Sequence, residues 1–230
     1  NSPSAGEEWL SGPYALLAAC NGLIKTLTQL KQKSFLQELP SRVTSSGQLA
    51  VNVVPHNVWD HLLLNGVKAE IWMQPYTNLP NLYNNTASSY DIPEENRLGS
   101  VSLVLGAGNI SAISPLDCLH KLFFEHSVVI LKMNPVNQYL QDVLILALQP
   151  LISRGALRIV SGGADVGSWL CNHPEIEDIH ITGAQTTHDT IVWGTGPQGE
   201  INRQNNTPIN QRRITSELGG VFPVIVFPGK

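Results

Sequence analysis

The spacing of apolar residues differs between the first part of the chain and the rest. Residues 14–39 carry apolar side chains at intervals close to 3.6, which predicts a helix. Residues 57–64 predict a second helix, and the alternation over 67–73 predicts a strand. Pro, Asn and Tyr are frequent over 75–97, which is typical of a long connection. We therefore expect residues 1–98 to form an N-terminal helical segment and a connection that pack on the core of the chain.

From residue 99 onward, short apolar runs alternate with helical patterns. The runs that predict strands are 101–105, 128–132, 157–160, 176–182, 190–194 and 223–227. Helical patterns separate the first four runs, and the polar stretch 195–213 predicts a surface loop. Continuous apolar strands that alternate with helices are typical of a parallel sheet buried on both faces. We therefore predict that 99–230 form a doubly wound, Rossmann-like α/β domain, whose ligand binds beyond the carboxyl ends of the strands.

The composition restricts the partners of this protein. The 230 residues are 42% hydrophobic and only 14% charged, with a formal net charge of −4 and no basic run. A nucleic-acid partner is therefore not expected. No apolar stretch reaches the roughly 18 residues of a membrane span, and the N-terminus lacks the pattern of a signal peptide. The low charge has two open explanations: a surface covered by another domain or a homo-oligomer partner, or a surface rich in uncharged polar residues.

The cysteines do not form a chemical motif. Cys20, Cys118 and Cys171 lie far apart, are odd in number and match neither a disulfide framework nor a metal site. All three fall within helical patterns, so we expect them to be buried and not catalytic. The histidines show no metal spacing either, and we predict no metal site. Without a disulfide framework, the cytoplasm is the expected location.

Two polar residues at strand ends could carry chemistry. Lys132 ends the run 128–132, where its ammonium could bind the ribose or phosphate of a nucleotide. Asn109 follows the run 101–105, and its amide could donate to a developing oxyanion. Each also has an ordinary explanation, because a lysine often marks the exit of a strand into water and an asparagine favours turns. Taken singly, the ordinary explanation is the better one for both.

Glycine-rich segments follow the later strands. Residues 162–167 follow a strand and open a helix, which suits either a phosphate at the helix N-terminus or tight packing. Thr182 and Gly183 end another strand, where the glycine either lets a flat ring lie against the backbone or simply makes a turn. Glu217 precedes a leucine and two glycines, and its carboxylate could act as a general base or remain a surface group.

The order and spacing of these residues are more specific than any one of them. The region from about Leu98 to Val226 resembles the nucleotide-binding domain of the aldehyde dehydrogenase superfamily. Asn109 stands where that family has the asparagine of its Pro-Trp-Asn motif, and Lys132 follows at the family's spacing. Residues 172–184 resemble the family's stretch that leads into a Phe-Thr-Gly-Ser turn, and 217–220 match its Glu-Leu-Gly-Gly motif.

The resemblance implies a cofactor site for NAD or NADP. Lys132 would contact the adenine ribose, and Gly183 would lie near the pyrophosphate and the nicotinamide. Gly163 and Thr182 would complete the cofactor-binding set.

The resemblance also implies a reaction. A cysteine thiolate would attack the carbonyl of an aldehyde or acyl substrate to give a thiohemiacetal or thioester, while Asn109 stabilises the oxyanion and Glu217 acts as general base. In the family, that cysteine lies on a separate domain well beyond the Glu-Leu-Gly-Gly motif. We therefore expect the full-length protein to be an NAD(P)-dependent oxidoreductase. This chain, as a fragment without the catalytic domain, is expected to be inactive alone.

Departures from the family pattern leave two alternatives open. Pro135 stands where many NAD-preferring members have a ribose-binding glutamate, and Ala184 replaces the serine of the turn. These differences are compatible with an acyl-CoA or acyl-ester reductase that uses NADPH. They are also compatible with a non-catalytic module that keeps the fold for nucleotide binding or assembly.

Overall fold

The computed structural model describes residues 2–220, so the predicted strand at 223–227 lies outside the described residues. The chain divides into two compact units. One contains residues up to 17 together with those from 98 onward, and the other contains residues 18–97. The N-terminal helices are α1 (Pro3–Trp9), a π-helical turn over Leu10–Tyr14 and α2 (Ala15–Thr28), and the division between the units falls inside α2.

The unit formed by 18–97 is built on a three-stranded antiparallel sheet in the order β1-β2-β3. Its strands are β1 (Ser41–Val43), β2 (Leu49–Val54) and β3 (Ala69–Trp72). The short helix α3 (Val58–Leu63) starts at Asn57, whose side chain accepts from the N–H of Asp60 while the Asp60 carboxylate accepts from the N–H of Asn57. This reciprocal capping box explains why the predicted helix begins at this point.

One prediction for this unit needs correction. The helix predicted over 14–39 ends at Thr28, and two short 3₁₀ turns follow, separated by Lys33, whose backbone is left-handed with φ of 46°. The strands β1 and β2 were not predicted. Leu49 and Val51 of β2 nevertheless form the core of the unit with Leu36 and Leu82.

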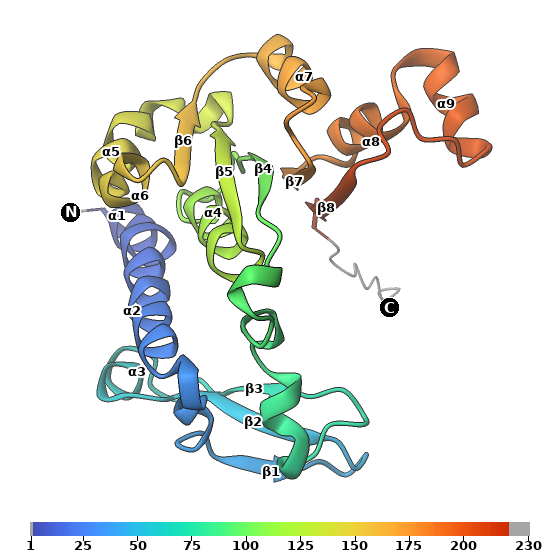
Figure 1. Ribbon diagram of the computed structural model, residues 1–230. Coiled ribbons are helices and arrows are strands. Elements are labelled where there is room, and N and C mark those ends of the chain that lie inside the picture. Colours follow the sequence, from blue (N-terminus) through green and yellow to red (C-terminus); the bar gives the residue numbers. More distant parts are fainter. Residues whose placement is uncertain (1, 221–230) are drawn as a thin grey trace, which may run out of the picture. The chain divides into compact units, whose positions relative to one another are not determined.

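The second unit is built on a five-stranded parallel sheet (Figure 1). Its strands are β4 (Ser100–Leu105), β5 (Ser127–Lys132), β6 (Leu157–Val160), β7 (Asp178–Gly183) and β8 (Arg213–Leu218). The sheet order is β6-β5-β4-β7-β8, and every adjacent pair is parallel. The chain therefore builds outward from β4 in one direction and then in the other. This arrangement confirms the predicted doubly wound α/β fold.

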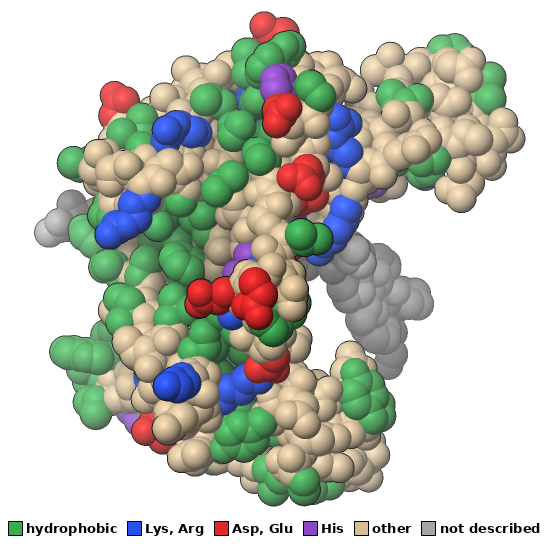
Figure 2. Space-filling view, in the orientation of Figure 1, with side chains coloured by type: hydrophobic (Ala, Val, Ile, Leu, Met, Phe, Trp, Pro, Cys, Tyr) green, Lys and Arg blue, Asp and Glu red, His purple; other side chains and the backbone are tan. Residues whose placement is uncertain are grey.

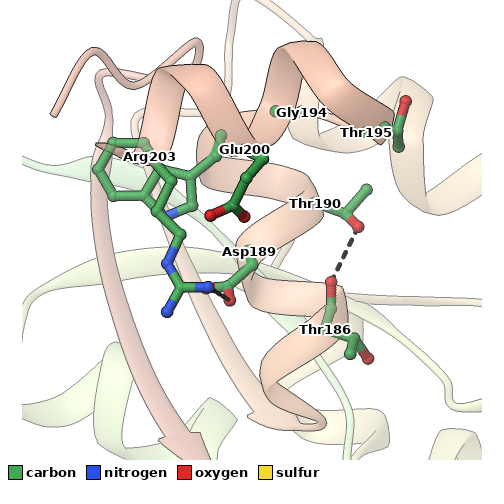
Figure 3. Close-up of a pocket in the computed structure, with 10 residues that line it drawn as sticks. Thr186, Asp189, Thr190, Gly194, Thr195, Glu200 and Arg203 are labelled. Atoms are coloured by element: carbon green, nitrogen blue, oxygen red, sulfur yellow. Dashed lines mark hydrogen bonds and ion pairs between the residues drawn. The ribbon is translucent and has the colours of Figure 1, made fainter. Parts of the chain in front are cut away.

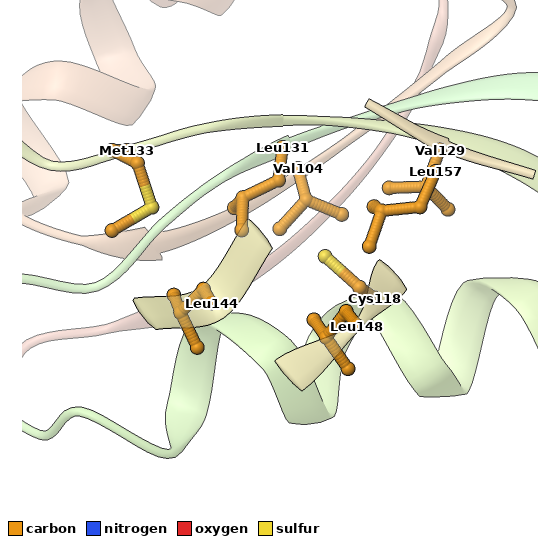
Figure 4. Packing of buried hydrophobic residues seen from close by; sticks show 8 residues of the cluster. All are labelled: Val104, Cys118, Val129, Leu131, Met133, Leu144, Leu148 and Leu157. Atoms are coloured by element: carbon orange, nitrogen blue, oxygen red, sulfur yellow. The ribbon is translucent and has the colours of Figure 1, made fainter. Parts of the chain in front are cut away.

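Helices cover both faces of this sheet. They are α4 (Ile113–Phe124), α5 (Gln141–Ala147), α6 (Gln149–Ser153), α7 (Ala164–Asn172) and α8 (Gln185–Trp193), and a 3₁₀ helix over Pro135–Leu140 precedes α5. The helix α9 (Gly196–Gln204) packs on α8. Val104 of β4 is fully buried in one core with Cys118 of α4 and Leu144 of α5 (Figure 4). Leu103, its neighbour in β4, packs into the other core with Leu170 of α7. Adjacent strand residues thus enter opposite cores, which is the reason the strands are continuously apolar.

The strand predicted at 190–194 is wrong, because these residues lie at the end of α8. Ile191 packs against the core that contains Leu170 of α7, so the apolar run belongs to a helix and not to a strand. A short apolar run cannot be assigned by periodicity alone. The stretch predicted as a loop from 195 contains α9, and β8 follows it.

The surface carries few charges. On the face drawn in Figure 2, acidic and basic side chains are scattered among hydrophobic and uncharged ones. No helix within residues 2–220 is both long enough and apolar enough to cross a membrane.

A buried polar network lies at the amino end of the parallel sheet. Lys121 of α4 is 1% exposed, and its Nζ lies 2.6 Å from Oδ1 of Asp178, the first residue of β7. Nζ also lies 3.0 Å from a carboxylate oxygen of Glu125, which in turn accepts from Arg213 at 2.5 Å. The second oxygen of Asp178 accepts from the hydroxyl of Ser102 at 2.5 Å. Every charge in this cluster is therefore paired, as burial requires.

Candidate functional site

A cavity of about 810 Å³ lies at the carboxyl ends of β4, β5 and β7. Helices α7 and α8 supply much of its wall. Strands β4 and β7 are neighbours at the point where the strand order reverses, which is where doubly wound sheets bind their ligands. The four residues predicted to bind a cofactor, Lys132, Gly163, Thr182 and Gly183, all line this cavity.

The loop after β5 is held by its own side chains. Asn134 accepts from the N–H of Val136 at 3.0 Å, and Pro135 occupies the first helical position. Asparagine is a favoured N-cap and proline suits the first helical position, and the first turns here are 3₁₀. Asn137 is buried and donates to the carbonyl of Ala107 in the loop after β4 at 3.1 Å. The two loops that border the cavity are therefore tied together.

Lys132 is the cationic side chain of the cavity wall. It is only 7% exposed, and no hydrogen bond or ion pair joins its ammonium to another described residue. Its stem runs beside α7, because a Cβ atom at Gly167 would lie 4.0 Å from its Cε. Burial lowers the pKa of Lys132, and this effect exceeds the opposite influence of Asp165 and Cys171. An ammonium that is desolvated and unpaired favours an anionic or hydroxyl-bearing ligand.

Two helices point their N-termini at the cavity. Gly163 precedes α7 and Ala184 precedes α8, and both residues line the cavity. Neither helix has a side-chain cap, so no side chain in the described structure satisfies their first-turn N–H groups. Gly162 has φ of 147°, and a Cβ there would lie 2.4 Å from Val166. The chain can therefore make this turn into α7 only with glycine at 162.

Thr182 contributes to the cavity wall, but its hydroxyl has a partner on the α4 side of the sheet. Its Oγ1 donates to the carboxylate of Asp117 at 3.1 Å. Asp117 also lies 3.5 Å from Nε2 of His180, whose Nδ1 is 2.8 Å from the hydroxyl of Thr215. This cluster ties α4 to β7 and β8. Thr182 therefore has a structural bond in addition to its predicted role.

The structure does not place the two predicted catalytic residues in the cavity wall. Asn109 is exposed in the connection between β4 and α4. Glu217 is exposed in β8 and pairs in register with Thr182. Asn109 follows β4, which borders the cavity, and Glu217 lies near the carboxyl end of β8, the neighbour of β7. Their chemical roles stay predictions.

Sequence reasoning missed the contribution of α8 to the cavity. Its lining residues are Thr186, Thr187, Thr190 and Ile191. They recur at intervals of three and four, which is the spacing of one helix face, and this signal was available in the sequence. The assignment of 190–194 to a strand hid it.

Asn210, in the segment before β8, was also missed. It is buried and lines the cavity. Its Nδ2 donates to the carbonyl of Cys171 at 3.2 Å, while its Oδ1 accepts from the backbone N–H of Arg212 at 3.2 Å. It therefore joins the C-terminal end of α7 to the start of β8.

A second, smaller cavity of about 420 Å³ lies between α8 and α9. Figure 3 shows Asp189, Glu200 and Arg203 gathered at its wall. Arg203 lies 3.6 Å from Asp189, and Glu200 accepts from Gln204 at 3.2 Å. The cation of this cavity wall therefore has a carboxylate partner, unlike Lys132 in the larger cavity.

Two of the three cysteines are buried, as predicted, whereas Cys20 is half-buried. Cys118 lies in the core, and burial raises the pKa of its thiol. Cys171 lines the large cavity, and burial raises the pKa of its thiol to about 11. A thiol with such a pKa is a poor nucleophile at neutral pH. Within residues 2–220, no group of His, Cys, Asp and Glu side chains is arranged to hold a metal ion.

No family model matches the chain. Among curated proteins, an aldehyde dehydrogenase of a Fusarium species is 27% identical over 148 residues, which cover 61% of this chain and 30% of that protein. An aldehyde dehydrogenase of Enchytraeus buchholzi is 37% identical over 75 residues, and the 4-trimethylaminobutyraldehyde dehydrogenase of Homo sapiens is 33% identical over 73 residues. These two matches cover 13% and 12% of the relatives' own lengths. The chain thus spans less than a third of the relatives it matches.

The likeness to solved structures is partial. A 3,6-anhydro-L-galactose dehydrogenase is 22% identical, covers 53% of this chain and gives a TM-score of 0.40. The aldehyde dehydrogenase of Mycobacterium tuberculosis is 14% identical, covers 82% of this chain and gives a TM-score of 0.37. The matches cover 23% and 28% of those chains. The sequence matches indicate that, over part of its length, this chain is homologous to the aldehyde dehydrogenase superfamily.

Proposed function

We propose that this chain is the nicotinamide-dinucleotide-binding region of an aldehyde dehydrogenase-like oxidoreductase. One observation carries the proposal. The four residues assigned to a cofactor from sequence alone come from two strand ends and one helix start, and all of them line a single cavity. The aldehyde dehydrogenase relatives support the reaction class.

The cavity fits a dinucleotide in size and chemistry. Its volume of about 810 Å³ lies within the range of pockets that hold organic ligands of this size. The unpaired Lys132 offers a cation, and the uncapped N-termini of α7 and α8 offer backbone N–H groups to phosphate oxygens. Gly183 leaves open space, because a Cβ there would meet only the side chain of Ile181. A flat ring can therefore approach the backbone.

When bound, the nicotinamide would accept or donate the hydride. The residues of this chain would bind the cofactor and hold it in orientation. Asn109 would donate its side-chain N–H to the oxyanion that develops on the substrate carbonyl. Glu217 would take the proton from water or from a thiol, and its exposure in β8 leaves it reachable from solvent. The substrate would be an aldehyde, and the cysteine nucleophile would come from a region of the whole protein that this chain does not supply.

Isothermal titration calorimetry of the purified 230-residue chain tests the proposal. We expect NAD or NADP to bind in a 1:1 ratio, and Lys132→Met to weaken the tighter of the two. Lys68→Met is the matched control, because Lys68 is exposed and does not line the cavity. A chain that is folded by circular dichroism but binds neither dinucleotide would contradict the proposal and favour a non-catalytic module.

A second assay tests the expectation that catalysis needs a further region. We expect the purified chain to show no aldehyde-dependent reduction of NAD or NADP. Turnover that survives further purification would show that the chain supplies its own nucleophile. Mutating each of its cysteines to serine would then identify that residue.

A further inference from the structure

We propose that His180 is a positioning residue of the large cavity and that its protonation strengthens the binding of a dinucleotide there. It acts through Asp117, whose carboxylate holds the hydroxyl of Thr182, a residue of the cavity wall. This inference rests on the proposed function, because it concerns binding in the same cavity. It goes beyond that function by making the binding depend on pH.

His180 lies in a polar cluster on the α4 side of the parallel sheet. Its Nε2 lies 3.5 Å from Oδ2 of Asp117 and 3.3 Å from the hydroxyl oxygen of Thr182. Its Nδ1 lies 2.8 Å from the hydroxyl of Thr215 in β8. The side chains of His180 and Asp117 are only 14% and 15% exposed. The imidazole therefore has polar neighbours at both nitrogens and little contact with solvent.

Thr182 and His180 reach the same carboxylate oxygen. Oδ2 of Asp117 accepts from the Thr182 hydroxyl at 3.1 Å, and it is also the atom that lies 3.5 Å from Nε2 of His180. A neutral imidazole carries one N–H, whereas a protonated one carries two, together with a positive charge. Hydrogen bonds between charged groups are shorter and stronger than neutral ones. Protonation of His180 therefore draws the carboxylate toward the ring and weakens its hold on the Thr182 hydroxyl.

Release of this hydroxyl gives the cavity a new donor. Thr182 lies near the end of β7 between Ile181 and Gly183, and all three residues line the cavity. A hydroxyl that no longer donates to Asp117 can donate to an oxygen of a bound ligand. A dinucleotide offers phosphate, hydroxyl and amide oxygens, and the positive charge of the ring also favours its phosphates. Protonation should therefore strengthen binding.

The other charges near His180 do not replace this contact. Besides Asp117, the charged or basic groups of the elements packed around it are His120, Lys121 and Glu125 of α4 and its end, Asp178 of β7, and Arg213 and Glu217 of β8. Lys121 and Arg213 are engaged with Asp178 and Glu125 at the amino end of the sheet. His120 lies 3.4 Å from Glu125, and Glu217 is exposed. Histidine is the side chain that ordinarily gains its proton near neutral pH.

Calorimetric titration of the purified chain with NAD⁺ and NADP⁺ at two pH values tests the inference. We expect the affinity to rise about three- to tenfold from about pH 8 to about pH 6, because one hydrogen bond to the ligand is gained as His180 is protonated. The variant His180→Gln stays neutral and should bind with the same affinity at both pH values. Thr182→Val, which removes the hydroxyl, should lose most of the rise. His120→Gln, an exposed histidine on the same helix as Asp117, is the control and should keep it.

NMR of the ¹⁵N-labelled chain without ligand tests the contact itself. Long-range ¹H–¹⁵N correlations follow the protonation of the His180 ring, and the amide and methyl signals of Thr182 report on its surroundings. We expect the Thr182 signals to move with the same pH midpoint as the ring and to stay fixed in His180→Gln. Thr182 signals that are indifferent to the ring would overturn the inference.

The possible results separate this inference from the proposed function. Dinucleotide binding that is equally tight at both pH values would overturn the inference and leave the proposed function standing. A rise that survives His180→Gln or Thr182→Val would also overturn the inference, because another group would then be responsible. Comparison with His180→Gln at the same pH removes any titration of the ligand itself. A folded chain that binds neither dinucleotide at either pH would overturn both.

Discussion

Two buried lysines, Lys121 and Lys132, lie at opposite ends of the same parallel sheet and differ in one respect. Lys121 is 1% exposed, and its ammonium has carboxylate partners in Asp178 and Glu125. Lys132 is 7% exposed, and among the described residues its ammonium has none. The amino end of the sheet therefore holds a closed network, whereas the carboxyl end presents a cation to a cavity.

The difference separates structural charge from charge kept for a ligand. Burying an ammonium costs free energy unless a counter-charge accompanies it. At Lys121 the protein supplies that counter-charge from the start of β7 and the end of α4. At Lys132 no counter-charge among the described residues offsets the free-energy cost of burial, and burial lowers the pKa of that lysine. Perturbed ionisable groups in clefts are candidates for function for this reason.

The largest expected effect is on stability. Lys121→Met leaves the buried carboxylate of Asp178 without its counter-charge, and we expect a loss of about 3–5 kcal/mol in the free energy of unfolding. Lys132→Met removes an ammonium that has no partner, and we expect a change of about 0.5 kcal/mol or less, or a small gain. Urea denaturation followed by circular dichroism measures both. Similar losses for the two variants would show that Lys132 has a structural partner.

A smaller effect on stability is expected when the pH is lowered. Burial raises the pKa of Glu125, but hydrogen bonds from Arg213 and Lys121 lower it by more, so the net pKa lies below its usual range. Glu125 is therefore more acidic in the folded chain than in the unfolded one, where the pKa is about 4.3. Its contribution to stability is present above that value and is lost as the pH falls through the folded-state pKa.

The variant Glu125→Gln tests whether this contribution to stability is lost as the pH falls. We expect the variant to lose about 1–3 kcal/mol at pH 7, because charge-assisted hydrogen bonds to Arg213 and Lys121 are weakened. Between about pH 5 and 3 its stability should fall less steeply than that of the parent chain. Glu94→Gln, an exposed carboxylate in the other unit, is the control and should leave both quantities unchanged. An acid profile that is identical in parent and Glu125→Gln would contradict the pairing.

The parallel sheet could be predicted from sequence because its central strands are buried on both faces. Such strands are continuous apolar runs, and four of the five were recognised from that feature. The fifth, β8, contains Arg213, Thr215, Ser216 and Glu217, so its sequence has no apolar run. The run at 190–194 was assigned wrongly for a different reason, because periodicity alone cannot distinguish a short apolar run in a helix from a strand.

The site could be predicted in part. Strand ends and glycine turns fix where a ligand can approach, so Lys132, Gly163 and Gly183 were found from sequence. The sequence could not show that Lys121 has carboxylate partners and that Lys132 has none, because this pairing depends on which helix packs beside each lysine. In the sequence, Lys121 is an ordinary lysine in a helical pattern. Its partner Asp178 lies 57 residues away and meets it only in the folded chain.

The smallest expected effect concerns Asp165, which lies near Lys132, the lysine whose ammonium has no partner among the described residues. Its carboxylate raises the pKa of Lys132, against the larger effect of burial, and so stands within electrostatic reach of the proposed cofactor site. Asp165→Asn should tighten dinucleotide binding by about two- to fivefold, because a surface charge at this distance contributes up to about 1 kcal/mol. The gain should shrink in 0.5 M salt as screening increases. Weaker NAD⁺ binding in Asp165→Asn would instead identify that carboxylate as the acceptor for the ribose 2′-hydroxyl. Lys132 would then serve a non-phosphorylated ribose, and the carboxyl end of the sheet would resemble its amino end in pairing its lysine with an acid.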